Sequence, residues 1–283
     1  MAGMVRLPGG AFLMGTEDPD GFAGDGEGPV REIELTPFAI DETTVTNAEF
    51  ARFVASTGYR TEAETFGWSF VFYKLLSNEM LATRPQLVVE APWWCALPGA
   101  CWNHPEGPQS DLSERMDHPV VHVSWNDAVA YCRWAGKRLP TEAQWEYAAR
   151  GGLEQKRFPW GDELLPDGEH RCNIWQGRFP DENTLLDGYL GTAPARSFKP
   201  NGFGLYNMAG NVWEWCADRF SADFHLTGPR SDPAGPPQGS ARVLRGGSFL
   251  CHHSYCNRYR VAARYQNTPD SSTSNTGFRC IAT

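Results

Sequence analysis

The sequence predicts an α+β fold, a single domain over residues 1–283 with little regular secondary structure. Its 29 glycines and 21 prolines favour turns and irregular backbone over long helices. Its 11 tryptophans can supply core volume where regular elements are few. No low-complexity linker and no internal repeat divides the chain, and 41% apolar residues suffice for one sizeable core.

The first half of the chain alternates short strands with one clear helix. Residues 4–15 read as strand, turn and strand, and the alternation over 32–40 predicts a further strand. Thr46 and Glu49 have capping-box spacing, so a helix should begin there. Residues 61–119 are irregular and rich in Pro, Gly and Trp, and we expect ordered loops.

The second half of the chain should begin with two helices, and no further helix is expected after them. Residues 120–123 predict a short strand, Ser124 should cap a helix that ends at Gly136, and Thr141 opens a capping box for a helix to about Arg150. Beyond that point we expect turns and short strands, among them a strand over 244–248 that enters a Gly-Gly turn.

The net charge, the length of the apolar runs and the N-terminal residues argue against several classes of protein. A net charge of −9 argues against general nucleic-acid binding, which needs a basic surface. No apolar run approaches the roughly 18 residues of a membrane helix. The N-terminal residues lack the basic and apolar regions of a signal peptide. We therefore expect a cytoplasmic protein, in which most of the eight cysteines are free thiols or ligands.

The segment with the most chemical potential carries Cys251 and Cys256, with His252 and His253 between them. Two thiols at this spacing can bind a soft metal, form a disulfide or do redox work. Zinc would need further ligands, which either histidine could supply, but no second short cysteine pair is present. A two-thiolate site suits Cu(I). On spacing alone, a structural or incidental role ranks ahead of a catalytic one.

The surroundings of this pair are locally positive. Residues 241–264 contain five arginines and no acidic residue. Positive charge lowers a thiol pKa and favours the thiolate that binds metal. The ordinary interpretation is that these arginines pair with acidic residues elsewhere in the chain.

Two further segments have the oxygen groups that Ca²⁺ prefers. One runs from Asn207 through Gly210 and Val212 to Glu214, and the other joins 173–174 to 187–189. From the residues alone, turn formation by Asn and Asp is the better explanation.

Motifs along nearly the whole chain resemble those of the formylglycine-generating enzymes, or sulfatase-modifying factors. The motifs are Met14–Thr16, Ala91–Trp94, Trp102–Gly107, His122–Ala128, Gly136–Ala143, Asn207–Trp215, Cys251–Arg260, Gln266–Ser272 and Gly277–Cys280. Most are shared with a wider superfamily, but the Cys-x4-Cys segment is similar to that of the aldehyde-forming members.

The resemblance implies a compact domain, distantly similar to C-type lectin folds, and a reaction. The reaction is the aerobic oxidation of a cysteine, in a Cys-x-Pro-x-Arg segment of an unfolded sulfatase, to Cα-formylglycine. Cys251 and Cys256 would hold Cu(I), the substrate thiol would be the third ligand, and O₂ the acceptor. We expect a monomer without nucleic-acid or membrane partners.

The resemblance also assigns roles to individual residues. Those expected around the oxygen site are Ser248, Tyr255 and Asn275. Those expected to contact substrate are Trp93, Trp94, Trp102, Trp213 and Arg264, the first three as a groove for the proline. The expected structural calcium sites are Asn173, Ile174, Asp187 and Tyr189, and Asn207, Gly210, Val212 and Glu214. The carboxylate that meets the substrate arginine stays unnamed.

Two departures and two rivals accompany the resemblance. Cys132 and Cys280 match a disulfide of secretory relatives, whereas Ala149 and Val261 stand where a second pair would be, so that bridge cannot form. An iron-dependent sulfoxide synthase would need an additional helical domain, for which the chain has no room. A binding paralogue without chemistry would lack the cysteine pair.

Overall fold

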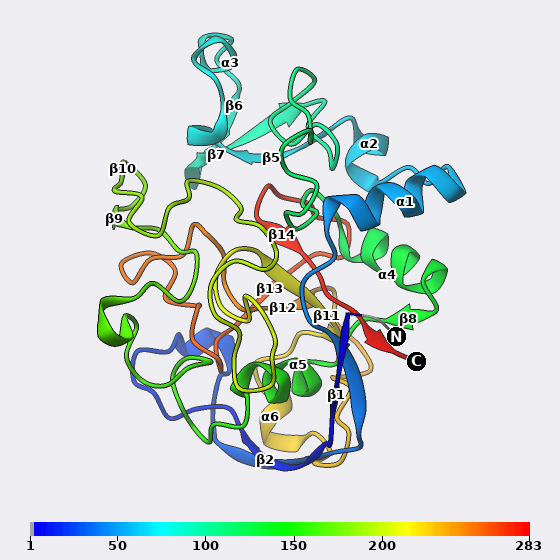
Figure 1. The fold of residues 1–283 in the computed structure, drawn as a ribbon, viewed down its shortest axis with the longest axis vertical. Coiled ribbons are helices and arrows are strands. Elements are labelled where there is room, and N and C mark those ends of the chain that lie inside the picture. The colour runs from blue at the N-terminus through cyan, green and yellow to red at the C-terminus, as the bar shows by residue number, and fades with distance from the viewer. Residues whose placement is uncertain (1–2) are drawn as a thin grey trace.

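The computed structural model describes residues 3–283, in which short helices and five small sheets surround a core with long irregular connections (Figure 1). The helices are α1 (Asn47–Thr57), α2 (Glu62–Phe66), α3 (Asn78–Ala82), α4 (Trp125–Trp134), α5 (Glu142–Arg150) and α6 (Phe224–Thr227). No helix in the described residues is long and apolar enough to cross a membrane. The α+β class and the scarcity of regular structure are as predicted.

Capping boxes begin the main helices, as their sequences predict. The side chain of Thr46 accepts from the backbone N–H of Glu49, whose carboxylate accepts in return, and Ser124 and Thr141 do the same for α4 and α5. Helix α4 ends at Trp134, slightly before the expected Gly136.

One four-stranded sheet joins the two ends of the described chain. Its order is β1 (Met4–Leu7), β4 (Phe38–Asp41), β15 (Ile281–Ala282) and β8 (Lys137–Arg138). Ile281 pairs with Ile40 on one side and with Arg138 on the other. Strand β1 accordingly lies near the C-terminal end of the chain in Figure 1.

A second four-stranded sheet lies at the centre of the molecule and carries the candidate site. Its order is β13 (Arg264–Asn267), β12 (Arg242–Arg245), β11 (Trp213–Arg219) and β14 (Thr276–Gly277). Two small sheets complete the lower and left parts of Figure 1, β2 (Gly10–Met14) with β3 (Arg31–Leu35), and β9 (Gly177–Arg178) with β10 (Glu182–Asn183).

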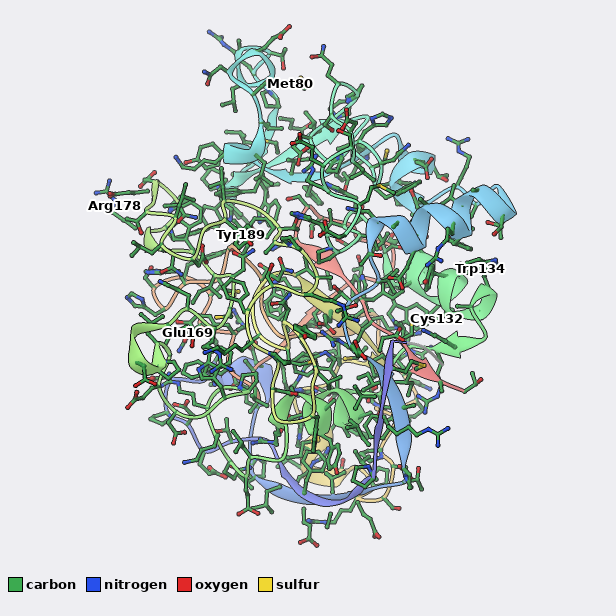
Figure 2. All side chains as sticks on the ribbon, in the orientation of Figure 1. Met80, Cys132, Trp134, Glu169, Arg178 and Tyr189 are labelled. Atoms are coloured by element: carbon green, nitrogen blue, oxygen red, sulfur yellow. The ribbon has the colours of Figure 1, made fainter. Side chains whose placement is uncertain are left out.

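The expectation of loops over 61–119 was wrong in part. This region contains α2, α3 and a three-stranded sheet of β5 (Trp68–Phe72), β7 (Ala91–Pro98) and β6 (Gln86–Val88), which together form the upper lobe in Figure 1. Met80 of α3 lies at the tip of this lobe (Figure 2). A fourth capping box, Thr61 with Glu64, begins α2 and is a sequence signal that the expectation of loops did not use. The strands depend on pairing across the sequence, which local composition does not reveal.

Three smaller expectations also need correction. Residues 120–123 are not a strand, because His122 has a φ of 57° that breaks extended pairing. The strand expected over 32–40 is two strands, interrupted at Thr36-Pro37 because proline cannot donate to a ladder. The strand expected over 244–248 covers Arg242–Arg245 and ends before the Gly-Gly turn.

Candidate active site

The loop that joins β12 to β13 carries both cysteines of the Cys-x4-Cys segment. The loop leaves β12 through Gly246 and Gly247, at φ values of 90° and 73°. A Cβ at Gly247 would come within 2.9 Å of the carbonyl oxygen of Arg258, on the returning arm of the loop. Glycine therefore lets the two arms of the loop lie against each other, which is the tight turn expected after the strand.

Cys251 and Cys256 turn inward from this loop and are only 1% and 7% exposed. Burial, with the hydrogen bond to Cys256, raises the pKa of the Cys251 thiol well above its usual value. Burial also acts to raise the pKa of Cys256, but the hydrogen bond from Cys251 and the positive charge of Arg258 outweigh it and lower the pKa. The pair therefore combines one thiol with one group inclined to be a thiolate.

Arg258 is a functional residue that sequence reasoning did not single out. It lines the cavity beside Cys256, and its guanidinium lies 3.7 Å from the ring centre of Phe22 and 4.9 Å from that of Tyr265. Its Nε donates to Asp25 at 2.5 Å. The local excess of arginine was the available signal, but only the fold shows which arginine faces the thiols. Three of the other four arginines pair with carboxylates, as the ordinary interpretation held, in Arg245–Glu142, Arg245–Glu146, Arg260–Glu27 and Arg264–Glu142 ion pairs. The guanidinium of Arg242 instead lies 3.6 Å from the ring centre of Trp125.

A cavity of about 280 Å³ opens over the two cysteines, on one face of the central sheet. Ser248 and Asn275 form its polar wall. Asn275 donates from Nδ2 to Ser248 Oγ at 2.8 Å, while its Oδ1 accepts from Thr273 at 2.7 Å. Ser248 Oγ also accepts from the backbone of Leu250 at 3.3 Å, which leaves its own proton available to the cavity.

Aromatic side chains make the rest of the cavity and its rim. Trp213 lines it and stacks on Tyr265 with ring centres 5.4 Å apart. Tyr255 also lines the cavity, stacks on Phe179 at 4.3 Å and meets the edge of Trp93 at 4.8 Å. Burial raises the pKa of Tyr255, and the charge of Cys256 adds to this effect, so the phenol keeps its proton. Trp94 contributes to the wall from β7.

Two residues expected to contact substrate lie elsewhere. Trp102 is buried in the core against Phe50, with ring centres 5.3 Å apart, and does not line the cavity. Arg264 is fully buried and bonds both oxygens of Glu142 from Nε and Nη2, at 2.6 and 2.9 Å. Its Nη1 bonds three backbone carbonyls, so every nitrogen of the guanidinium already has a partner within the protein, and Arg264 does not line the cavity. Both are structural residues.

The neighbouring histidines do not complete a metal-ligand set with the cysteines. The ring centres of His252 and His253 lie 4.0 Å apart at a tilt of 47°, and neither residue lines the cavity. Within residues 3–283, no group of three or more His, Cys, Asp or Glu side chains is placed to hold a metal. A zinc site at this loop is therefore unsupported, whereas two thiols beside a cavity fit a soft ion that accepts few protein ligands.

The first expected calcium segment has a free oxygen. Asn173 donates from Nδ2 to Gly191 O at 2.8 Å, which fixes the amide, yet its buried Oδ1 has no partner. Asp187 accepts from the backbone N–H groups of Ile174 and Tyr189 at 3.0 and 3.1 Å, and burial raises its pKa. An orphaned buried carbonyl near a carboxylate and backbone carbonyls fits a hard cation such as Ca²⁺.

The second expected calcium segment fits less fully. Asn207 Oδ1 is likewise buried without a partner, while Nδ2 donates to Ala195 O at 3.1 Å. Glu214, however, is already bound by Arg279 through both oxygens, at 2.7 and 2.8 Å, and by Trp145 at 2.8 Å. The carboxylate expected to neutralise the ion is thus neutralised by an arginine.

Backbone hydrogen bonds join these segments to the cysteine loop. Gly210 donates to Gly246 O at 2.8 Å, and Asn211 donates to Asn173 O at 2.8 Å and accepts from Phe249 at 2.9 Å. A Cβ at Gly210, where φ is 72°, would lie 2.3 Å from Asn173 O. The two segments and the turn before Cys251 therefore form one braced unit.

Comparison with known proteins identifies the family to which this arrangement belongs. The family described as "Sulfatase-modifying factor enzyme 1-like domain" matches residues 1–283. The chain belongs to this family. A Thermomonospora curvata protein named "Formylglycine-generating enzyme" is 64% identical, over 99% of this chain and 93% of its own. A Bos taurus member named "Inactive C-alpha-formylglycine-generating enzyme 2" is 49% identical, over 99% and 87%. The structure of PvdO from Pseudomonas aeruginosa superposes with a TM-score of 0.71 at 26% identity, over 98% and 93%. The sulfatase-modifying factor family thus includes a member named as inactive, and the site has to decide the activity.

Proposed function

We propose that this chain is a formylglycine-generating oxidase, which converts the cysteine of a Cys-x-Pro-x-Arg segment in an unfolded sulfatase to Cα-formylglycine. The observation that carries the proposal is the pair of buried thiols, Cys251 and Cys256, beside a cavity of about 280 Å³. Family membership and the 64% identity to a protein named for this reaction support it.

Cys251 and Cys256 would hold Cu(I), which suits two thiolates and leaves a position for the substrate sulfur. When bound, copper supplies the redox chemistry with O₂ that removes hydrogen from the substrate Cβ. The resulting thioaldehyde takes up water, and the aldehyde forms as hydrogen sulfide leaves. The substrate gives up two electrons and O₂ takes four on the way to water, so a thiol reductant has to supply the other two.

The protein side chains bind, orient and exclude water. Arg258 faces Cys256 and favours its deprotonated form before any metal arrives. Asn275 fixes Ser248 by a 2.8 Å hydrogen bond, so the free hydroxyl proton of Ser248 can be directed at a small acceptor in the cavity. Trp213 and Tyr265 close one side with apolar rings, which strengthens such polar contacts by excluding water.

The rim suits the proline of the substrate. Tyr255, Phe179 and Trp93 form a packed aromatic group beside the cavity, and Trp94 lies in the wall. Proline rings pack well on flat aromatic faces, and an extended segment needs little ordering to bind there.

The test is a turnover assay read by mass spectrometry. The copper-loaded protein is incubated in air with a Cys-x-Pro-x-Arg peptide and a thiol reductant, beside Cys256→Ser and the matched control Cys95→Ala. Cys95 is also a buried free thiol, but it lies in a different apolar cluster. We expect copper-dependent aldehyde in wild type and Cys95→Ala and none in Cys256→Ser.

The rival function is peptide binding without chemistry, and the relative named as inactive is the observation that favours it. Peptide binding with no aldehyde from the intact, copper-loaded protein would establish that rival.

A further inference from the structure

We infer that the cation site at Asn173 and Asp187 controls the cysteine loop, so that Ca²⁺ and Cu(I) bind cooperatively. The inference rests on the proposed function, because it takes Cys251 and Cys256 as the copper ligands. It gives the calcium site a role beyond support of the fold, since the occupancy of that site then sets how tightly the two thiols hold their metal.

The first argument is a direct backbone link between the two sites. The N–H group of Trp175 donates to the carbonyl oxygen of Cys251 at 3.0 Å. The two residues that precede Trp175 are Asn173 and Ile174, both expected ligands of the cation. A shift of this segment therefore reaches Cys251 along the main chain, without passing through a side chain.

The second argument is a parallel link through Asn211. Its N–H donates to Asn173 O at 2.8 Å, and its own carbonyl oxygen accepts from Phe249 at 2.9 Å. Its side-chain oxygen accepts from Asn173 Nδ2 at 3.2 Å. Phe249 lies two residues before Cys251, and it shares a buried apolar cluster with Trp175. Hydrogen bonds and packing thus tie the same two segments together.

The third argument is that this closed arrangement is costly without a cation. Asn173 is 0% exposed, and its Oδ1 has no partner. Asp187 is 8% exposed, and its partners within residues 3–283 are N–H groups and not a basic side chain. Polar groups that are buried and poorly satisfied destabilise the arrangement that buries them. An opening of residues 173–175 relieves this cost, but it breaks the bonds to Cys251 and Asn211.

A bound cation reverses this balance. Carbonyl and carboxylate oxygens are the ligands that Ca²⁺ prefers, so Ca²⁺ binds the closed arrangement and raises its population. The closed arrangement also holds Cys251 beside Cys256, where both thiols line one cavity. Each metal therefore favours the state that binds the other, and the two affinities rise by the same factor.

The second expected calcium segment is a weaker candidate for this control. The carboxylate of Glu214 is already paired with Arg279. Its link to the loop is the hydrogen bond from Gly210 to Gly246 O, five residues before Cys251. We therefore assign the coupling to the segment that contacts Cys251 itself.

The test compares the Cu(I) affinity of the protein with and without Ca²⁺. Anaerobic protein competes with bicinchoninate for Cu(I), either in a calcium chelator or at a saturating Ca²⁺ concentration. The variants are Asp187→Asn, which removes the charged ligand, and the matched control Asp181→Asn, an exposed carboxylate in the turn between β9 and β10. Thermal unfolding shows that each variant is folded.

We expect Ca²⁺ to tighten Cu(I) binding at least about fivefold in wild type and in Asp181→Asn, and less than about twofold in Asp187→Asn. Calorimetry should show the reciprocal effect, with Ca²⁺ bound more tightly by the copper-loaded protein. A Cu(I) affinity in wild type that Ca²⁺ leaves unchanged would overturn the inference. An equal response in Asp187→Asn would do the same.

A second measurement works without copper. In copper-free wild type, Ca²⁺ should slow hydrogen exchange at least about tenfold in the peptides that contain Trp175 and Cys251, and Asp187→Asn should show no such protection. Unchanged exchange in wild type would overturn the inference. Protection by Ca²⁺ in a protein that binds no Cu(I) would uphold the control of the loop and instead remove copper from the proposed function.

Discussion

The buried carboxylate of Glu142 offers a test of how the core is held together beneath the site. Glu142 is buried at the start of α5, where it accepts from Arg264 at 2.6 and 2.9 Å and from Arg245 at 3.1 Å. Burial acts to raise its pKa, but the charges of Arg264 and Arg245 outweigh burial and lower the pKa to about 2. We expect Glu142→Gln to destabilise the protein.

The size of the effect follows from the pKa. A fall from 4.5 to about 2 corresponds to about 3 kcal/mol, at about 1.4 kcal/mol for each tenfold change in proton affinity. Breaking a buried ion pair by removing one partner typically costs about 3–5 kcal/mol, which agrees. Because the pKa is lowered on folding, this stabilisation is complete above pH 4.5 and disappears as the pH falls toward 2.

The assay is urea unfolding of wild type, Glu142→Gln and the exposed control Glu90→Gln at a series of pH values. We expect the glutamine variant to lose about 3 kcal/mol at pH 7, and its disadvantage to shrink below pH 4.5. A loss below about 1 kcal/mol at pH 7, or a disadvantage that does not change with pH, would refute the reasoning.

Three further predictions concern the site and its supports. Asn275→Ala should lower turnover at least tenfold and leave Cu(I) affinity unchanged, since Asn275 fixes Ser248 and touches no thiol; an equal loss of copper affinity would contradict this role. Ca²⁺ should raise the unfolding temperature of wild type but not of Asn173→Ala, because the variant lacks the buried Oδ1 that has no partner. At a Ca²⁺ concentration a hundredfold above Kd, the free energy of unfolding of wild type should rise by about 2.7 kcal/mol. Diamide should link Cys132 to Cys280, whose sulfurs are 3.4 Å apart. The disulfide would close a long loop and should raise the free energy of unfolding by at most about 5 kcal/mol. Non-reducing peptide mapping of wild type and Cys132→Ser would detect the bond, and separate thiols after treatment would contradict the prediction.

Local chemistry explains which parts of the fold the sequence could predict. The helices behind Thr46, Ser124 and Thr141 follow from side-chain hydrogen bonds within four residues, and all three are present. The sheet made by β5, β6 and β7 depends on pairs such as Val71 with Cys95, 24 positions apart, and composition alone does not reveal these pairs.

The site divides in the same way. Cys251, Cys256, Ser248 and Asn275 line one cavity, as the family resemblance implies. Asn275 contacts Ser248 although the two residues are 27 positions apart in the sequence. Arg264, which was expected to contact substrate, is a buried structural residue, and Arg258, for which no role was expected, lines the cavity beside the thiols. Both are arginines of one basic segment, and only the positions of Glu142 and Asp25 determine which is buried and which faces the thiols.

The pairing of β4 with both β1 and β15 has a consequence for synthesis on the ribosome. Ile40 can pair with Val5 as soon as both are synthesised, but Ile281 follows some 240 residues later. The edge of β4 that pairs with β15 therefore stays unpaired while those residues are translated. An unpaired edge of this kind invites association with other nascent chains. We expect the protein to acquire protease resistance only after Ile281 has left the ribosome, and chaperones that shield strand edges to raise its yield more than slower translation does.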